Sequence, residues 1–311
     1  MKTGATRRWP LAWIWLGTVA ACLFICTWFA AADEPAAVAP MTYIYPAPES
    51  PEDVRYLDLV ALLKGALDHT TKEYGPYQLQ ATALPMTEAR QLMELGKRGN
   101  GPRQITVVWS STSEEKERDL RPILIPLRKG LLGYRICLIR AEHQAEIDRI
   151  NTLEDLRHYT VGQGIGWGDI DVYNANEIRV LTALYKQLFG MTDAGRFELF
   201  PRGINEVFDE FEENRKTNPH LAIEQHLLLY YPWPYYFFFN RADVQASTRV
   251  EKGLWLMIQD GSFEASFQRF HGEAIKRANL AGRRVIRLNN PLLPTDTPLN
   301  NPILWYEPAG S

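Results

Sequence analysis

The chain has 311 residues, of which 46% are hydrophobic and 23% charged, so it can form one large globular domain or two lobes. Residues 1–32 carry Lys2, Arg7 and Arg8 and no acidic residue, so their removal would change the formal charge from −3 to −6. A negative chain is repelled by nucleic acid, which we therefore exclude as an expected partner.

The N-terminus has the pattern of an export signal. Arg7 and Arg8 form a basic region, and residues 11–30 form an apolar run. Three alanines follow and fit a signal-peptidase cleavage site. We therefore expect residues 1–32 to be a cleaved signal peptide and the mature protein to reside in the periplasm.

Two alternatives remain open for this segment. The apolar run is long enough to remain as a membrane anchor, and residues 19–22 resemble a lipoprotein signal. An alanine- and proline-rich linker follows at 33–40. Once the signal is removed, Cys137 is the only cysteine of the sequence, which excludes an internal disulfide. This cysteine is then either a core residue or a reactive thiol.

The first part of the mature chain alternates strands with helices. Apolar runs predict strands at 41–45, 77–83 and 105–109. A helix is expected at 54–69, where leucines and alanines recur at helical spacing, and a second short helix is expected after the cap residue Thr87. This β-α-β-α-β order favours a parallel α/β sheet.

A hydroxyl-rich stretch, WSSTSEEKER at 109–118, precedes a further β-like run at 123–127. Its five side-chain donors are Ser110, Ser111, Thr112, Ser113 and Arg118. Ser113 is the expected N-cap of a helix, whose free N–H groups and positive dipole end attract anions. The guanidinium fork of Arg118 suits a carboxylate or a phosphate. The alternative is a surface turn with an ordinary helix cap.

The following region, at about 135–228, reads as a second α/β unit. Its expected elements are strands at 134–140, 159–162 and 197–200, a capping box at Thr152 to Asp155, and helices at 181–189 and 205–215. The aromatic segment 227–240 then returns to the first unit. Two helices at 244–259 and 262–279, a strand at 284–287 and an extended proline-rich tail end the chain.

Three short motifs resemble those of a known family. Residues 110–118 resemble its SS-x-S-x-x-x-x-R stretch, residues 194–198 its AGR-(I/L)-D block, and residues 260–263 its DG-(T/S)-(Y/F) block. Together with the element order, they resemble the type II periplasmic solute-binding proteins, in particular the polar amino-acid branch that feeds ABC importers (solute-binding family 3). The chain is then a divergent member.

The resemblance implies an α/β fold with two lobes, built from two mixed sheets that are joined by two crossing segments. Lobe 1 would comprise residues 41–133 and 229–311, and lobe 2 residues 134–228. It also implies that the ligand lies between the lobes. Lobe 1 would hold the ligand carboxylate through Ser113 and Arg118, with Ser110, Ser111 and Thr112 beside them.

The resemblance extends to further ligand contacts. Tyr45 follows the first strand, where the family places an aromatic residue that stacks on the ligand. Gln163 and Trp167, in the glycine run 162–168, are expected on a lobe-2 loop that closes over the ligand; the alternative is a plain turn. Trp167 also disfavours nucleotide binding, because it stands where a phosphate loop needs a small residue.

The second lobe departs from the family pattern. The family places an aspartate after the lobe-2 strand to bind the ligand ammonium, and this place falls at Gly203. Arg202 precedes it and disfavours a plain α-amino acid, whereas Glu206 could replace the aspartate if it points inward. Both residues are therefore candidate ligand contacts.

No catalytic or metal-binding motif occurs in the sequence, so we expect neither an enzyme nor a cofactor. The predicted function is periplasmic binding of a small polar, anionic or amino-acid-like solute by a monomer, with an inner-membrane ABC permease as its partner. The alternative is an exported sensor or interaction protein that has this fold and no transport role.

Overall fold

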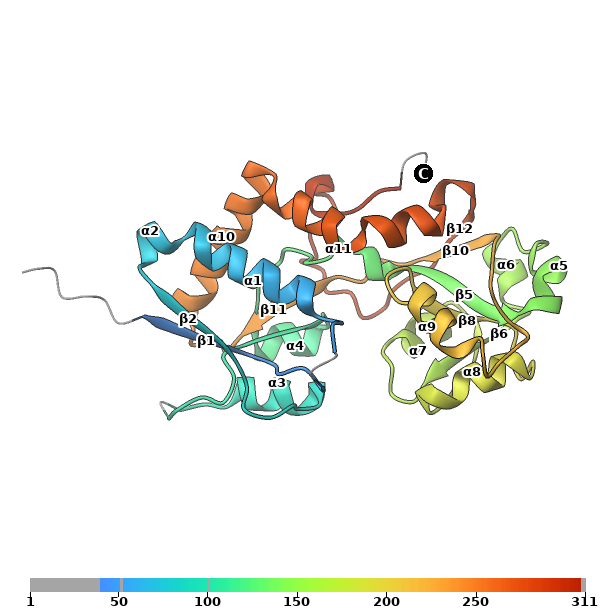
Figure 1. The fold of residues 1–311 in the computed structure, drawn as a ribbon, viewed down its shortest axis with the longest axis horizontal. Helices are drawn as coiled ribbons and strands as arrows, with labels where there is room; N and C mark the ends of the chain where they lie inside the picture. The colour runs from blue at the N-terminus through green and yellow to red at the C-terminus, as the bar shows by residue number, and fades with distance from the viewer. Residues whose placement is uncertain (1–39, 51–52, 100, 309–311) are drawn as a thin grey trace, which may run out of the picture. The chain divides into compact units, whose positions relative to one another are not determined.

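The computed structural model describes residues 40–50, 53–99 and 101–308 (Figure 1). The predicted signal peptide, its two alternatives and all of the predicted linker except Pro40 lie outside the described residues. Within the described ranges, none of the helices combines the length and the hydropathy that a membrane span requires.

The chain opens with a two-stranded parallel sheet. Strand β1 (Met41–Tyr45) pairs with β2 (Tyr77–Ala81), and helix α1 (Leu57–His69) connects them. A short helix, α2 (Thr71–Tyr74), follows α1. The predicted apolar face of α1 is confirmed as buried: Leu59, Leu62, Leu63, Ala66 and Leu67. Burial of this face anchors the helix against the rest of the first core.

The next sheet is antiparallel, where a parallel one was predicted. Strand β11 (Tyr235–Phe239) lies between β3 (Val107–Ser111) and the short β4 (Arg121–Pro122). The β-like run at 123–127 does not form a strand, because Pro126 interrupts it and no ladder forms. Its backbone still donates two hydrogen bonds to β11 carbonyls, so the run lies beside the sheet without joining it.

Two helix caps of this region are confirmed. Thr87 accepts a hydrogen bond from Arg90 N at the start of α3 (Glu88–Gly96). Ser113 accepts one from Lys116 N at the start of α4 (Glu114–Asp119). In both cases a hydroxyl satisfies an N–H group that has no partner inside the helix.

The largest sheet is mixed and has five strands. Strand β5 (Tyr134–Arg140) pairs antiparallel with β8 (Phe200–Gly203), β9 (Leu221–Ile223) and β10 (Leu227–Tyr230), and β12 (Arg284–Arg287) lies parallel beside β10. The predicted strands at 134–140 and 284–287 are thus confirmed. The predicted strand at 197–200 is displaced toward β8.

A separate parallel pair joins β6 (Thr160–Gly164) to β7 (Arg179–Ala183), with α7 (Asp169–Ala175) between them. The predicted helix at 181–189 is wrong at its start, because residues up to 183 pair with β6 and the helix α8 (Tyr185–Asp193) begins only afterwards. Tertiary pairing here overrides local helical preference. The capping box is confirmed at α6 (Leu153–Leu156).

The remaining short elements complete the element order. They are η1 (Leu131–Gly133), η2 (Ala141–His143), α5 (Gln144–Ile147), α9 (Val207–Asn214), η3 (Leu280–Gly282) and η4 (Pro302–Leu304).

Two segments pass between the sheets, as predicted. One lies at η1 and leads into β5, and the other lies at residues 231–234, between β10 and β11. They touch each other, since Tyr231 N donates to Gly133 O at 3.2 Å. A Cβ on Gly133 would lie 2.0 Å from Tyr231 O, so only glycine allows this approach. In the described residues the strands form four hydrogen-bonded sheets, where two were expected.

The two predicted C-terminal helices are confirmed as α10 (Val244–Asp260) and α11 (Ser262–Ala278), which meet at Gly261 with φ 82°. Helix α10 packs closely on α1, and a Cβ on Gly253 would lie 2.0 Å from Ala66 O. Figure 1 shows α1, α10 and α11 close together. Helix α11 buries Phe263 in one hydrophobic core and Phe267 and Ala278 in another, so it links these two cores.

Candidate functional site

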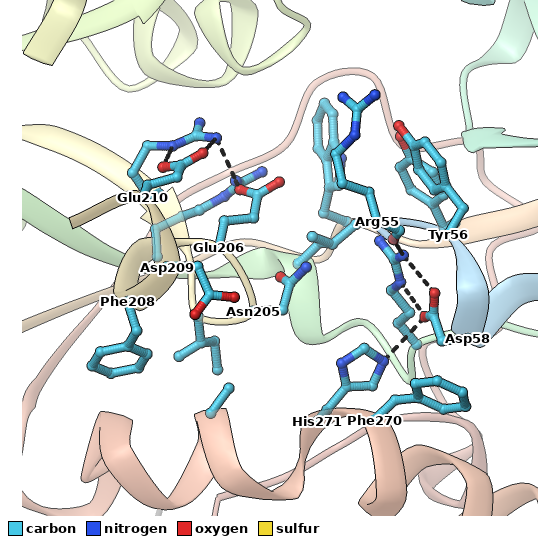
Figure 2. Close-up of a pocket in the computed structure, with 18 of the residues that line it drawn as sticks. Arg55, Tyr56, Asp58, Asn205, Glu206, Phe208, Asp209, Glu210, Phe270 and His271 are labelled. Atoms are coloured by element: carbon cyan, nitrogen blue, oxygen red, sulfur yellow. Dashed lines mark hydrogen bonds and ion pairs between the residues drawn. The ribbon is translucent and has the colours of Figure 1, made fainter. Parts of the chain in front are cut away.

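The described residues line an open cavity of about 940 Å³, called the main cavity below. Its walls come from the segment before and within α1, from the end of β3, from β5, and from the β8–α9 and α11 regions. Its polar and aromatic lining includes Arg55, Tyr56, Asp58, Glu88, Ser111, Arg128, Arg135, Trp167, Asp169, Tyr185, Arg202, Asn205, Glu206, Glu210, Trp233, Tyr235 and His271. Figure 2 shows Glu206 and Glu210 on one side and Asp58 and His271 on the other.

One wall carries a buried ion pair between α1 and the chain that precedes β5. The Nε–H and Nη2–H groups of Arg128 donate hydrogen bonds to Asp58 Oδ2 and Oδ1, at 2.6 and 2.8 Å. His271 Nε2 lies 3.2 Å from Asp58 Oδ2. Burial alone would raise the pKa of Asp58, but the charge and hydrogen bonds of Arg128 outweigh it and hold this pKa well below its usual range.

The opposite wall holds Arg202, at the end of β8. Its Nε and Nη2 donate to the two carboxylate oxygens of Glu210 at 2.5 and 2.6 Å. Three aromatic rings surround the guanidinium: its Cζ lies 4.8 Å from the centroid of Trp167, 5.3 Å from Phe200 and 5.7 Å from Tyr185. The positive charge of Arg202, which we expected to contact the ligand, is therefore neutralised by Glu210.

A third arginine projects from β5. Arg135 Nη2 lies 2.7 Å from Asp169 Oδ1, and Asp169 also accepts a hydrogen bond from the hydroxyl of Tyr231. The Arg135 Nε is buried and has no partner among the described residues. Arg128, Arg202 and Arg135 are thus each paired with a carboxylate.

Glu206 is a fourth carboxylate, and it is not committed to one arginine. Its Oε2 accepts a hydrogen bond from Gly203 N at 3.1 Å and lies 3.2 Å from Arg202 Nη2 and 3.8 Å from Arg135 Nη1. No described residue donates to Oε1, and 34% of the side chain is exposed. Burial would raise the pKa of Glu206, but Arg202 and Arg135 lower it, so the carboxylate stays ionised.

The hydroxyl-rich loop after β3 is occupied by a cation of its own chain. Lys116 Nζ donates to Ser110 Oγ at 2.7 Å and to Ser111 O at 2.9 Å. Ser110 donates to Glu88, and Thr112 donates to Glu117. The predicted anion donors are therefore used internally, and of these three hydroxyl residues Ser111 lines the main cavity.

Ser113 and Arg118 do not line the main cavity. They line a second cavity of about 650 Å³, together with Arg98, Lys116 and Arg241. The Arg118 side chain is 67% exposed, and its Nε lies 3.0 Å from Asp119 Oδ1. Residues two apart in a helix point about 200° apart, so once Lys116 faces the loop, Arg118 faces away from it.

The other predicted contacts divide in the same way. Trp167, Arg202 and Glu206 line the main cavity together with Ser111. Tyr45 packs instead against the ring of Trp109, at a centroid distance of 6.1 Å, on the surface of the first core. Gln163 is buried outside the cavity lining, and neither of its amide atoms has a partner among the described residues.

Sequence reasoning missed the residues that pair with the arginines. Asp58, Arg128, Arg135, Asp169 and Glu210 come from separate elements and meet only in the folded chain. A usable signal was present in part, since Arg128 and Arg135 interrupt apolar runs and Asp58 begins the apolar face of α1. Charges at such positions are buried only when they are paired. In the described part of the chain, no cluster of three or more His, Cys, Asp or Glu side chains could hold a metal.

No protein-family model matches the sequence, and no curated protein sequence matches it. The fold is that of the two-lobed periplasmic binding proteins, so the resemblance noted in the sequence is confirmed at the level of the fold.

Two solved structures carry this comparison. A Salmonella typhimurium periplasmic binding protein with high arginine specificity aligns with 74% of this chain and 98% of its own, at 13% identity and a TM-score of 0.50. A Bacillus subtilis protein solved by a structural genomics consortium aligns with 75% of this chain and 91% of its own, also at 13% identity and a TM-score of 0.50.

Proposed function

We propose that the protein binds a small amino-acid-like solute in the main cavity, with Glu206 receiving the solute's ammonium group. The observation that carries this proposal is the position of the Glu206 carboxylate. A Cβ built on Gly203 would lie 3.0 Å from Glu206 Oε2. The carboxylate thus lies beside the place where a side chain at 203 would begin, which is where the resemblance puts the ammonium-binding aspartate.

The charge of the cavity supports a solute with a cationic group. Its lining residues include eight carboxylates and five guanidinium groups. Arg128, Arg135 and Arg202 each have a carboxylate partner closer than Glu206, and no described residue donates to Glu206 Oε1. An ammonium group placed against it would gain a charge-assisted hydrogen bond, worth about 1.5–3 kcal/mol.

Arg128 is our candidate for the solute's carboxylate, in place of Arg118. Its Nε and Nη2 are held by Asp58 and by the carbonyl of Arg55, whereas Nη1 has no partner among the described residues. The pair with Asp58 fixes the guanidinium in one orientation, so a solute would find a positioned donor. Ser111 adds a hydroxyl to the same cavity.

We further propose that the protein works in the periplasm and delivers its solute to an inner-membrane ABC permease. The predicted export signal and the periplasmic binding protein fold support this role. Cell fractionation tests the location: a periplasmic pool of chain lacking residues 1–32 supports the proposal, and retention of the whole chain in the inner membrane opposes it.

A thermal-shift screen of residues 33–311 tests solute binding. Amino acids, dicarboxylates, short peptides and polyamines form the panel. A ligand at 100 times its dissociation constant stabilises the fold by about 2.7 kcal/mol, which a melting curve resolves. We expect hits among amino acids and their loss in Glu206→Gln. A hit that persists in this variant would remove Glu206 from the site.

One observation favours a second candidate, an exported sensor or interaction protein. Because Arg128, Arg135 and Arg202 each already have a carboxylate partner, these three charges need no solute to satisfy them. A flat thermal-shift screen together with a specific envelope protein recovered by pull-down would favour this candidate over solute binding.

A further inference from the structure

The surroundings of Arg202 form a binding site in their own right. Trp167, Tyr185, Phe200 and Glu210 make up what we call the guanidinium cage. The rings of Trp167 and Phe200 are inclined by only 17°, with centroids 6.4 Å apart, and Tyr185 adds a third side. Tyr185 also donates its hydroxyl to Glu210 Oε1 at 2.9 Å, which fixes the carboxylate opposite the rings.

Each part of the cage matches a property of a guanidinium ion. The ion is flat and weakly hydrated, so its faces pack on aromatic rings. Its forked N–H groups fit both oxygens of one carboxylate, as they do on Glu210 at 2.5 and 2.6 Å. A lysine ammonium has neither the flat faces nor the fork, so the geometry of the cage matches guanidinium better than ammonium.

The cage opens into the main cavity. Trp167, Tyr185, Arg202 and Glu210 all line this cavity, whereas Phe200 is fully buried behind them. A solute that enters the cavity therefore meets the cage from its open side, where it finds the guanidinium of Arg202 already in place.

We propose that Arg202 is a built-in occupant of a guanidinium subsite and that it makes the cavity reject solutes which carry a guanidinium group, such as arginine. Arg202 is attached to β8, opposite Ile136 of β5, so it fills the subsite without the entropy loss that a free solute would suffer. Removal of its side chain opens the subsite to guanidinium solutes. The rejection of solutes rests on the proposed function, whereas the subsite itself does not.

The variant Arg202→Ala exposes the subsite. It leaves the Glu210 carboxylate, whose side chain is 12% exposed, without its bidentate partner. Loss of one partner of a buried pair destabilises strongly, and for a chain of this size we expect the melting temperature to fall by roughly 10 °C. A free guanidinium ion that fills the cage should reverse part of this loss.

The experiment measures the melting temperature of the exported protein and of its Arg202→Ala variant in millimolar methylguanidinium, methylammonium or L-arginine. We expect methylguanidinium and arginine to raise the melting temperature of the variant by several degrees and to leave the unsubstituted protein unchanged. Methylammonium, at the same ionic strength, should change neither protein.

Two further variants are controls. Arg202→Lys keeps a cation in the cage and should not respond to methylguanidinium. The double variant Arg202→Ala/Glu210→Ala lacks the forked acceptor and should have lost the response as well. If Arg202→Ala proves insoluble, refolding with each ion replaces the melting curve, and recovery with methylguanidinium alone is the supporting result.

Other outcomes overturn the inference. Equal responses to methylguanidinium and methylammonium would mean that the cage does not select guanidinium, and so would a response that survives the loss of Glu210. Binding of arginine by the unsubstituted protein would contradict the occupant role of Arg202 while supporting solute binding. Conversely, a selective response in Arg202→Ala establishes the subsite even if no amino acid binds the unsubstituted protein.

Discussion

Replacement of Asp58 by alanine should cost more stability than any other single loss of a carboxylate on the cavity wall. Both side chains of the Asp58–Arg128 pair are only 6% exposed, and two hydrogen bonds join them. His271, on α11, also contacts Asp58 at 3.2 Å. The substitution would therefore leave a buried guanidinium without its counter-charge and remove a link between α1 and α11.

The expected loss is about 3–5 kcal/mol, the range measured when one partner of a buried pair is removed. For a chain of this size the loss corresponds to a fall in melting temperature of roughly 10 °C. A matched surface pair provides the control: Arg215 Nε lies 2.7 Å from Glu212 Oε2, and about half of each side chain is exposed. Glu212→Ala should change the unfolding free energy by no more than about 0.5 kcal/mol.

The contribution of Asp58 to stability should depend on pH, because its pKa is lowered in the folded protein. Arg128 holds the pKa of Asp58 below its usual value, so the contribution of this carboxylate is complete above its unfolded-state pKa of about 3.9. It is lost progressively as the pH falls below that value toward the lower pKa of the folded state. Between pH 7 and pH 3, the stability gap between the protein and Asp58→Ala should narrow by about 1 kcal/mol.

Urea unfolding followed by tryptophan fluorescence measures these differences. Equal shifts of the unfolding midpoint in Asp58→Ala and Glu212→Ala would contradict a stabilising role of the buried pair, and so would a stability gap that widens on acidification.

Two other predictions concern packing and the thiol. Gly253→Ala should destabilise the protein by about 1–3 kcal/mol, because the new methyl group would lie 2.0 Å from the backbone of Ala66. The control is Gly272→Ala on α11, where the methyl group would meet only the side chain of Gln268, at 3.1 Å. This control should be neutral or stabilising in thermal melts. Equal effects of the two substitutions would show that α1 and α10 are not in close contact. Burial raises the pKa of the Cys137 thiol, so a thiol reagent should label it only in denaturant; labelling of the native protein at a similar rate would contradict its core position.

Local sequence signals predicted the helices and their caps best. The apolar face of α1, the caps at Thr87 and Ser113 and the capping box at Thr152 depend on neighbours within a few residues, and all are confirmed. Strand pairing was harder to predict because it depends on distant partners. Residues up to Ala183 form β7 only because β6 lies alongside, and nothing in their own composition requires it.

The candidate site could be predicted only in part, for the same reason. Arg202 and Glu206 were found because they flank a position that the resemblance marks. Glu210, the partner of Arg202, lies eight residues further along the chain, in α9. Asp58, the partner of Arg128, is 70 residues distant. The resemblance also marks Arg118, but the ammonium group of Lys116 binds the loop instead. Arg118 lies two residues further along α4, so its exposed side chain points away from the loop.

The lobe boundaries predicted at 134–228 and 229–311 stay predictions. The strand β12 pairs with β10 in the sheet that contains β5, so part of the C-terminal region lies in the same sheet as β5. The chain's route through α11 and the proline-rich tail could not be derived from the order of elements, because that order says nothing of which sheet a late strand joins.

The most direct test of solute binding in the main cavity is a calorimetric titration of the best solute from the screen into three proteins. These are the unsubstituted protein, Glu206→Gln and Arg118→Ala. We predict that Glu206→Gln weakens binding at least tenfold, the equivalent of about 1.4 kcal/mol, and that Arg118→Ala stays within twofold. The reverse pattern, a loss in Arg118→Ala and none in Glu206→Gln, would place the solute in the second cavity, which Arg118 lines, and contradict binding in the main cavity.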